Sequence, residues 1–215
     1  LRYREGGNVR FLLASLGGYG LSLGSKEMGV TLPLLFVCYD VVEGFGKGEK
    51  ERGYGAELLS TIKSVVMRSK YLYGISFVGG LGYGYYKVFI KSPSHQVGYY
   101  GDSMVTTFLT VGKILVYYLK LLIYPIRLQA DYSYDAFPLS TSLFEPSTLV
   151  SFMILGVMVY VVGRLMVRER MAAFGMIWFF VTLLPVCHII PHHELLAEHY
   201  LYLPSVGFCL VVGVV

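Results

Sequence analysis

Near the end of the chain the sequence reads His193-Glu194-Leu195-Leu196-Ala197-Glu198-His199-Tyr200-Leu201-Tyr202-Leu203-Pro204-Ser205. This polar stretch interrupts two long apolar runs, residues 174–190 and 201–215. Titratable side chains beside such runs are costly in a bilayer unless they face water, a partner or a site. The stretch therefore predicts the rim of a polar cavity at a membrane surface. A charged loop that only caps two helices is the alternative.

The composition of the whole chain supports a membrane setting. The 215 residues are 55% hydrophobic and 15% charged, and the mean hydropathy is +0.59. A soluble domain usually carries about 25% charged residues. The composition therefore predicts an all-α fold of the polytopic, helical integral membrane class. The net charge of +4 is modest, and no basic tract suggests a nucleic-acid partner.

The apolar runs predict six membrane spans, at residues 11–23, 28–42, 71–90, 148–163, 172–190 and 201–215. The first two are short and predict a tight helical hairpin. Basic residues gather in the segments 43–70 and 164–170, which predicts that both segments are cytoplasmic. Because the sequence does not begin with Met and stops inside an apolar run, we expect an internal piece of a longer protein.

Two further helices are predicted outside these spans. Within 43–70, apolar residues recur at helical spacing and predict a short helix on the membrane surface: Leu58, Ile62, Val65 and Val66. In the segment 107–124, polar residues recur every three or four positions and form one stripe: Thr106, Thr110, Lys113, Tyr117, Lys120 and Tyr124. The stripe predicts an interfacial or re-entrant helix, because a crossing here would place 164–170 outside. An ordinary span with its lysines facing the bundle is the alternative.

This topology brings polar residues from distant segments to the outer side, among them Lys26, Glu27, Asp131, His193, Glu194, Glu198 and His199. Asp131 and Asp135 predict either a pair for acid–base work or a solvated acidic loop. A metal site is not favoured, because His199 follows His193 by six positions instead of the four of the H-E-x-x-H motif. Binding of an anionic head group or orientation of a substrate is the favoured interpretation of this outer face.

Three blocks of sequence carry a resemblance to a known family. The first is Ser25-Lys26-Glu27 with Thr31-Leu32-Pro33 and Tyr39-Asp40. The second runs from Tyr117-Tyr118-Leu119-Lys120-Leu121-Leu122 through Pro125 to Asp131-Tyr132-Ser133. The third is Trp178-Phe179, Leu184-Pro185-Val186, Ala197-Glu198 and Tyr200 to Phe208. Together they resemble the membrane domain of the transmembrane and tetratricopeptide-repeat (TPR) O-mannosyltransferases and their bacterial relatives, which are glycosyltransferases of the GT-C type.

The resemblance implies a membrane glycosyltransferase that moves a hexose, mannose in this family, from a polyprenyl-phosphate donor to Ser or Thr of an acceptor protein. The chemistry would take place on the periplasmic side of a bacterial inner membrane or the lumenal side of the endoplasmic reticulum. No cofactor is implied, and the lipid-phosphate sugar is a substrate. The catalytic acidic motif is expected upstream of Leu1 and the repeats beyond Val215, so the fragment alone is expected to be inactive. The rival function is a non-catalytic binder, transporter or scaffold for lipid-linked sugars.

The resemblance also implies a set of donor- or substrate-binding residues. They are Lys26, Glu27, Lys120, Asp131, His193, Glu194, Glu198, His199 and Tyr202. Cationic and hydrogen-bonding groups in this set would stabilise the charge on the leaving phosphate. The chain departs from the family at two positions, with His199 where Arg is common and His188 where Asn is common. An imidazole is a weaker, pH-dependent cation than a guanidinium.

Overall fold

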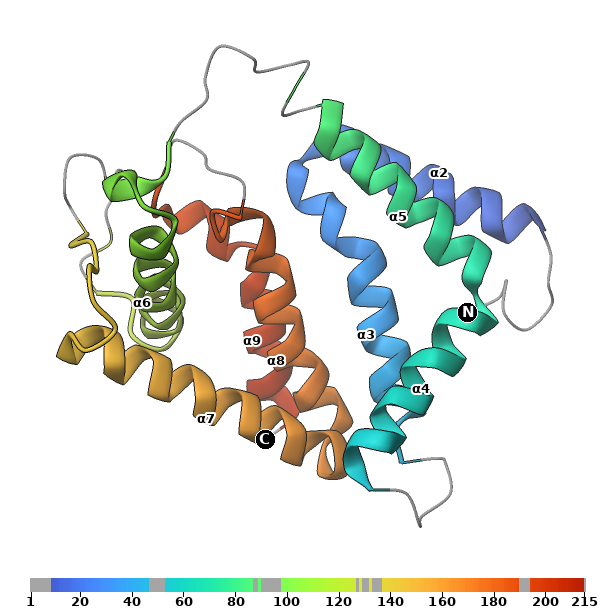
Figure 1. Cartoon of the computed structure of the whole chain (residues 1–215). Helices are drawn as coiled ribbons and strands as arrows, with labels where there is room; N and C mark the ends of the chain where they lie inside the picture. Colours follow the sequence, from blue (N-terminus) through green and yellow to red (C-terminus); the bar gives the residue numbers. More distant parts are fainter. Residues whose placement is uncertain are drawn as a thin grey trace. The chain divides into compact units, whose positions relative to one another are not determined.

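The computed structural model describes residues 9–46, 53–86, 89, 98–126, 128, 132, 137–189 and 194–214, without the side chain of Glu27. Within these residues the chain forms helices, turns and loops and contains no strand, so the all-α prediction is confirmed. The chain divides into two compact units, Leu1–Ser94 and His95–Val215, each of which is described by itself (Figure 1).

The described part of the first unit contains α2 (Val9–Ser25), η1 (Glu27–Thr31), α3 (Leu32–Gly44), α4 (Tyr54–Arg68) and α5 (Lys70–Tyr85). α2 ends at Ser25 because Lys26 adopts an extended backbone conformation. Pro33 lies in the first turn of α3, where its missing N–H removes no helical hydrogen bond. The helix expected around Ile62 is confirmed as α4.

α2 packs against α5 and not along α3, so the predicted tight hairpin of the first two helices is wrong. The ring of Tyr19 lies against Gly79 and Gly80, and a Cβ atom on Gly80 would lie only 2.8 Å from the Tyr19 hydroxyl oxygen. The glycines therefore provide a notch that a larger residue would fill. α3 contacts α5 separately, where the Tyr73 hydroxyl donates a hydrogen bond to the Asp40 carboxylate.

The described part of the second unit contains η3 (Tyr100–Asp102), α6 (Met104–Ile123), α7 (Pro146–Arg168), α8 (Arg170–Leu183), η4 (Leu184–Val186), η5 (Glu198–Leu201) and α9 (Pro204–Val214). Among the helices that the structure describes, α8 and α9 form the most extensive contact. A Cβ atom on Gly207 would lie 2.4 Å from the carbonyl oxygen of Gly175, so only glycine permits this approach. The Trp178 indole N–H also donates a hydrogen bond of 2.9 Å to the carbonyl oxygen of Leu203.

The predicted span 172–190 ends earlier than expected. α8 stops at Leu183 and is followed by the short η4, because Pro185 lacks the N–H that would continue the helix. His188 then adopts a φ of +52°, which turns the chain away from the helix axis. The final apolar run also begins later than predicted, because η5 covers Leu201 and α9 starts at Pro204.

α6 lies transverse to α7 and α8. Figure 1 views α6 nearly along its axis, while α7 and α8 lie across the view. α6 crosses α7 at a close contact, where the rings of Phe108 and Phe152 are 5.9 Å apart. The crossing brings α6 alongside the chain that follows α8.

The polar stripe of α6 faces the segment 137–148. The Lys113 ammonium donates a hydrogen bond of 2.9 Å to the carbonyl oxygen of Pro138 and lies 5.5 Å from the ring centroid of Phe137. The Thr110 hydroxyl accepts a hydrogen bond of 2.9 Å from the Ser140 N–H. The inner part of the stripe therefore serves an intramolecular contact. The interfacial or re-entrant position of α6 stays a prediction.

Two helices in the described part of the chain are long and apolar enough to cross a bilayer, namely α6 and α7. α7 extends the predicted span 148–163 to 23 residues. The other predicted spans coincide with α2, α3, α5, α8 and α9, which have between 11 and 17 residues each. A helix perpendicular to the membrane needs about 20 residues to cross it.

Candidate functional site

The polar cluster predicted near the end of the chain lies between α8 and α9. Leu196, Ala197, Tyr200 and Leu201 are buried, whereas His199 and Tyr202 are exposed. The apolar residues therefore anchor the segment, and the polar side chains between them point to its surface.

Tyr118 fixes the middle of this segment to α6. Its hydroxyl donates a hydrogen bond of 3.1 Å to the carbonyl oxygen of Ala197 and accepts one of 3.2 Å from the N–H of the same residue. Both residues are buried. A buried peptide group needs partners for its N–H and its carbonyl oxygen, and one side chain provides both here. The backbone immediately before Glu198 is therefore held in place.

Glu198 is held by the loop that follows α6. The Tyr132 hydroxyl donates a hydrogen bond of 2.7 Å to Glu198 Oε1, and the Tyr117 hydroxyl oxygen lies 3.3 Å from that of Tyr132. The ring of Phe137 packs edge-on against Tyr117 at 5.6 Å. Burial raises the pKa of Tyr132, and its hydrogen bonds to Tyr117 and Glu198 raise it further. Tyr132 therefore remains a protonated donor to the carboxylate.

Glu194 forms a second carboxylate–tyrosine pair. The Tyr200 hydroxyl donates a hydrogen bond of 2.8 Å to Glu194 Oε2. His199 Nε2 lies 3.8 Å from the same oxygen, and the His199 and Tyr200 ring centroids are 4.3 Å apart. Burial raises the pKa of Tyr200, and the hydrogen bond to Glu194 adds to this effect. The His199 contact is solvent-exposed, so it contributes little to stability.

His188 contacts the backbone of the polar segment between α8 and α9. Its Nε2 atom lies 3.3 Å from the carbonyl oxygen of Leu195, and its ring meets that of Tyr100 edge-on at 5.3 Å. Burial lowers the pKa of His188, although hydrogen bonds to the backbone of Leu195 and Glu194 act in the opposite direction. The neutral imidazole therefore joins the end of α8 to η3 and to the polar segment.

The structure brings together part of the predicted site. Glu194, Glu198 and His199 lie on one segment, in which Glu194 contacts Tyr200 and His199 while Glu198 contacts Tyr132 of the loop after α6. Lys120 is exposed in the last turn of α6, and Tyr202 is 82% exposed beside η5. Lys26 is exposed in the first unit, at the break before η1. Asp131, Asp135, His193 and the side chain of Glu27 lie outside the described residues, so their predicted roles stay predictions.

The partners of the two glutamates were not predicted as such. Tyr117 belonged to the polar stripe and Tyr132 to the acidic loop, but neither pattern pointed to Glu198. Tyr118 and Tyr200 lay within the blocks that carry the resemblance, and His188 was noted as a departure from the family, but none of the three pointed to these contacts. The contacts join residues 79 positions apart for Tyr118 and 66 for Tyr132, a distance over which local patterns carry no information.

The arrangement has defined chemical capacities. A carboxylate that accepts one hydrogen bond from a tyrosine retains lone pairs for a substrate hydroxyl or for a proton. The imidazole of His199 can donate or accept hydrogen bonds according to its protonation state. In the part of the chain that the structure describes, no three His, Cys, Asp or Glu side chains gather as metal ligands.

Comparisons with family models, with curated proteins and with solved structures find no match to this chain.

Proposed function

We propose that this chain is part of a polytopic membrane glycosyltransferase of the GT-C type. It moves a hexose, mannose by the resemblance, from a polyprenyl-phosphate donor to Ser or Thr of an acceptor protein. The active face is periplasmic in a bacterial inner membrane or lumenal in the endoplasmic reticulum. The proposal combines the sequence resemblance with three features of the structure.

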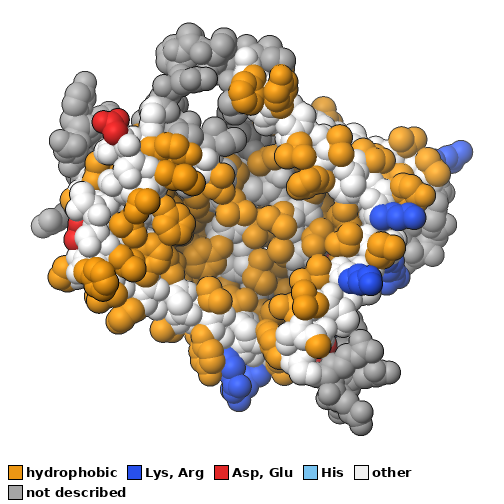
Figure 2. Space-filling model, in the orientation of Figure 1, with side chains coloured by type: hydrophobic (Ala, Val, Ile, Leu, Met, Phe, Trp, Pro, Cys, Tyr) orange, Lys and Arg blue, Asp and Glu red, His pale blue; other side chains and the backbone are white. Residues whose placement is uncertain are grey.

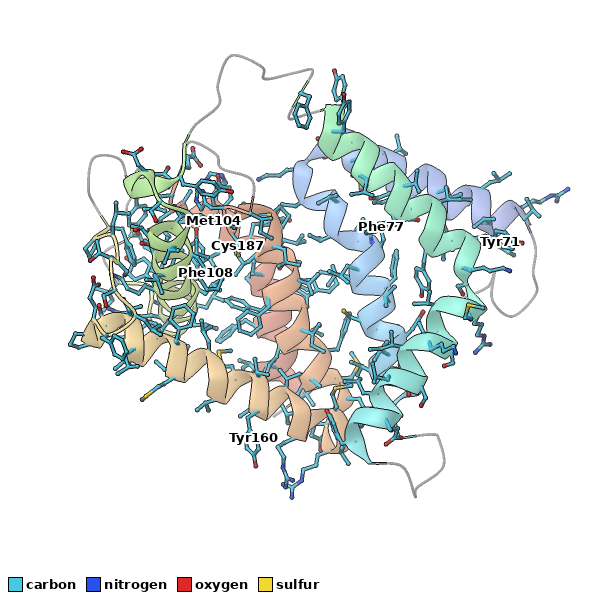
Figure 3. All side chains as sticks on the ribbon, in the orientation of Figure 1. Tyr71, Phe77, Met104, Phe108, Tyr160 and Cys187 are labelled. Carbon is cyan, nitrogen blue, oxygen red and sulfur yellow. The ribbon has the colours of Figure 1, made fainter. Side chains whose placement is uncertain are left out.

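The surface of α7 supports the membrane location. α7 is 23 residues long, and its apolar side chains remain exposed along its length, with Val157 61% and Val159 71% exposed. Tyr160 points away from the ribbon of α7 in Figure 3. Hydrophobic side chains also cover much of the visible face of each unit in Figure 2. Exposure of these apolar side chains to water would be unfavourable, whereas lipid chains would solvate them.

The ends of α7 and α8 support the predicted sidedness. The two helices meet at Glu169, between Arg168 and Arg170, which a positive-inside distribution places in the cytoplasm. The opposite ends adjoin the loop before Pro146 and the polar segment after α8. The Tyr132–Glu198 hydrogen bond joins this loop to this segment. One membrane face thus carries Arg168 and Arg170, and the other carries Glu194 and Glu198.

The observation that carries the proposed chemistry is the fixed position of Glu198. Tyr132 holds one of its oxygens, and Tyr118 holds the backbone just before it. A half-buried carboxylate fixed in this way can orient a sugar or acceptor hydroxyl during transfer. The catalytic base is expected from the acidic motif that the resemblance implies. Lys120, which lies on α6 as Tyr117 does, is the candidate cation for the donor phosphate. The transverse α6 would border this face of the bilayer.

The test measures transfer by the product of the complete gene in membranes. Radiolabelled polyprenyl-phosphate mannose and a Ser/Thr-rich peptide are the substrates. We expect E198Q to lower the transfer rate at least about tenfold, which corresponds to one interaction of about 1.4 kcal/mol in the transition state. E169Q, at an exposed glutamate of the cytoplasmic turn, is the matched control and should retain the wild-type rate. A wild-type protein that transfers no hexose would overturn the proposal.

A second function has one observation in its favour. Asp40 and Tyr73 are both buried and hydrogen-bonded to each other inside the first unit. Ionisable residues buried in membrane helices often mark ion or proton pathways, as expected of a transporter for lipid-linked sugars. The substitution D40N distinguishes the two functions. A transporter should lose substrate movement across vesicles while binding persists, whereas a transferase should retain transfer if it remains folded.

A further inference from the structure

α4 differs from the other α-helices that the structure describes in having no buried residue, although its sequence is amphipathic. At 100° per residue, six of its apolar side chains fall on one arc of about 140°, whereas Ala56 and Met67 fall outside it. The six are Tyr54, Leu58, Leu59, Ile62, Val65 and Val66. Lys63 and Arg68 fall about 40° beyond the two ends of this arc. The helix thus has an apolar face with one cation on each flank.

Only part of this face is covered by the first unit. The Tyr54 ring packs against Phe45 at the end of α3 with 4.9 Å between centroids. Leu59 is 70% exposed, Ile62 37% and Val66 39%. A contiguous row of exposed apolar side chains on a helix marks an interaction surface.

The charges around the face identify the chemistry of the occupant. The one acidic residue of α4, Glu57, accepts a hydrogen bond of 2.9 Å from the N–H of Gly46 and so is directed to the end of α3. Lys63 and Arg68 remain on the flanks, and Lys70 follows them with its ammonium 5.1 Å from the ring centroid of Tyr71. Long basic side chains beside an apolar face can extend to phosphate groups while their stems contact hydrocarbon. This pattern complements an anionic lipid surface.

The position of α4 in the chain points the same way. Ser69 alone separates it from α5, whose Ile75, Phe77, Val78 and Leu81 are exposed and apolar. In Figure 1, α4 and α5 meet at a bend. If α5 enters the bilayer at its first residue, the end of α4 must lie close to the membrane interface, because one residue separates the two helices.

We propose that α4 lies in the headgroup layer of an anionic phospholipid bilayer, with Leu59, Ile62 and Val66 in the hydrocarbon and Lys63 and Arg68 on lipid phosphates. This inference rests on the proposed membrane location. It adds a cytoplasmic lipid-binding surface that the transferase site does not require.

The test places single spin labels on the full chain in nanodiscs, after replacement of its three cysteines by alanine. Labels at Leu59 and Val66 report on the apolar face, Ser64 on the opposite face, and Val157 on α7. Collision with dissolved oxygen reports lipid exposure, and collision with a water-soluble nickel chelate reports water exposure. Each label is measured in phosphatidylcholine discs and in an equal mixture with phosphatidylglycerol.

We expect the labels at Leu59 and Val66 to meet oxygen more than chelate in the anionic discs, and the label at Ser64 to do the reverse. Each cation removed in K63Q and R68Q should reduce the ratio of membrane-bound to water-exposed α4 about fivefold in anionic discs only. The variants K63R and R68K retain the charge and should behave as the parent.

Three outcomes would contradict the inference, and they can be told apart. If the label at Val157 meets lipid while those at Leu59 and Val66 meet the chelate as Ser64 does, only the inference on α4 fails. If the label at Val157 meets the chelate, the membrane location fails with it. If the labels on α4 are shielded from both reagents in every disc and in detergent, a protein covers this face instead of lipid.

Discussion

The hydroxyl of Tyr118 makes two hydrogen bonds to the backbone of Ala197, one as donor to its carbonyl oxygen and one as acceptor from its N–H. The two residues are 79 positions apart, on α6 and on the segment between α8 and α9. This contact holds the carboxylate-bearing segment against the transverse helix. Its removal should therefore affect both stability and the position of Glu198.

For Y118F, we expect a loss of about 1–3 kcal/mol in the free energy of unfolding, because a buried N–H and a buried carbonyl lose their partner. Thermal unfolding followed by the fluorescence of Trp178 in detergent measures this loss. Y124F, at an exposed tyrosine just beyond α6, should unfold as the wild type does. Equal unfolding of Y118F and wild type would mean that the contact does not stabilise the segment.

The contact between α8 and α9 should not tolerate a methyl group. In G207A the new Cβ atom would lie 2.4 Å from the Gly175 carbonyl oxygen and 2.9 Å from the Phe179 nitrogen, so the helices must separate. We expect a destabilisation of about 1–3 kcal/mol from this overpacking. G213A on the same helix meets no atom within 4 Å and should be neutral or slightly stabilising. Similar unfolding of both variants would rule out the close approach.

Tyr200 should make the protein sensitive to alkali. Burial and the Glu194 hydrogen bond raise its pKa in the folded state, so above about pH 10 the unfolded chain releases a proton that the folded chain retains. The contribution is complete below that pH and is lost as the pH rises further. Y200F should show a smaller loss of stability between about pH 10 and 11. An unchanged slope in Y200F would show that this tyrosine titrates normally.

His188 should make the stability of the folded protein fall at acid pH. Burial lowers its pKa in the folded state, so below about pH 6.5 the unfolded chain binds a proton that the folded chain does not. Stability should be full above that pH and decline as the pH falls. Unfolding of H188N, compared with wild type at pH 8 and across the acid range, should show a smaller decline. A decline of equal size would assign the effect to other groups.

Part of this structure could be predicted from the sequence. The apolar runs, the break at Lys26 and the periodicity around Ile62 are local features, and each coincides with a helix or a helix end. Helix formation depends mainly on residues within a few positions of each other, so local patterns carry that information. The ends of the helices were predicted less well. α8 stops at Leu183, although the apolar pattern continues beyond it.

The contacts of the candidate site came only from the tertiary structure. The amino-acid pattern identified Glu194, Glu198 and His199 as residues of interest, because polar groups beside apolar runs need an explanation. It could not identify Tyr132 as the partner of Glu198, nor Gly175 as the partner of Gly207. These pairs depend on how helices cross, and the crossing is decided by the shapes of whole packed surfaces. The sequence by itself determined which segments are helical and where polar groups interrupt them, and packing decided which of those groups meet.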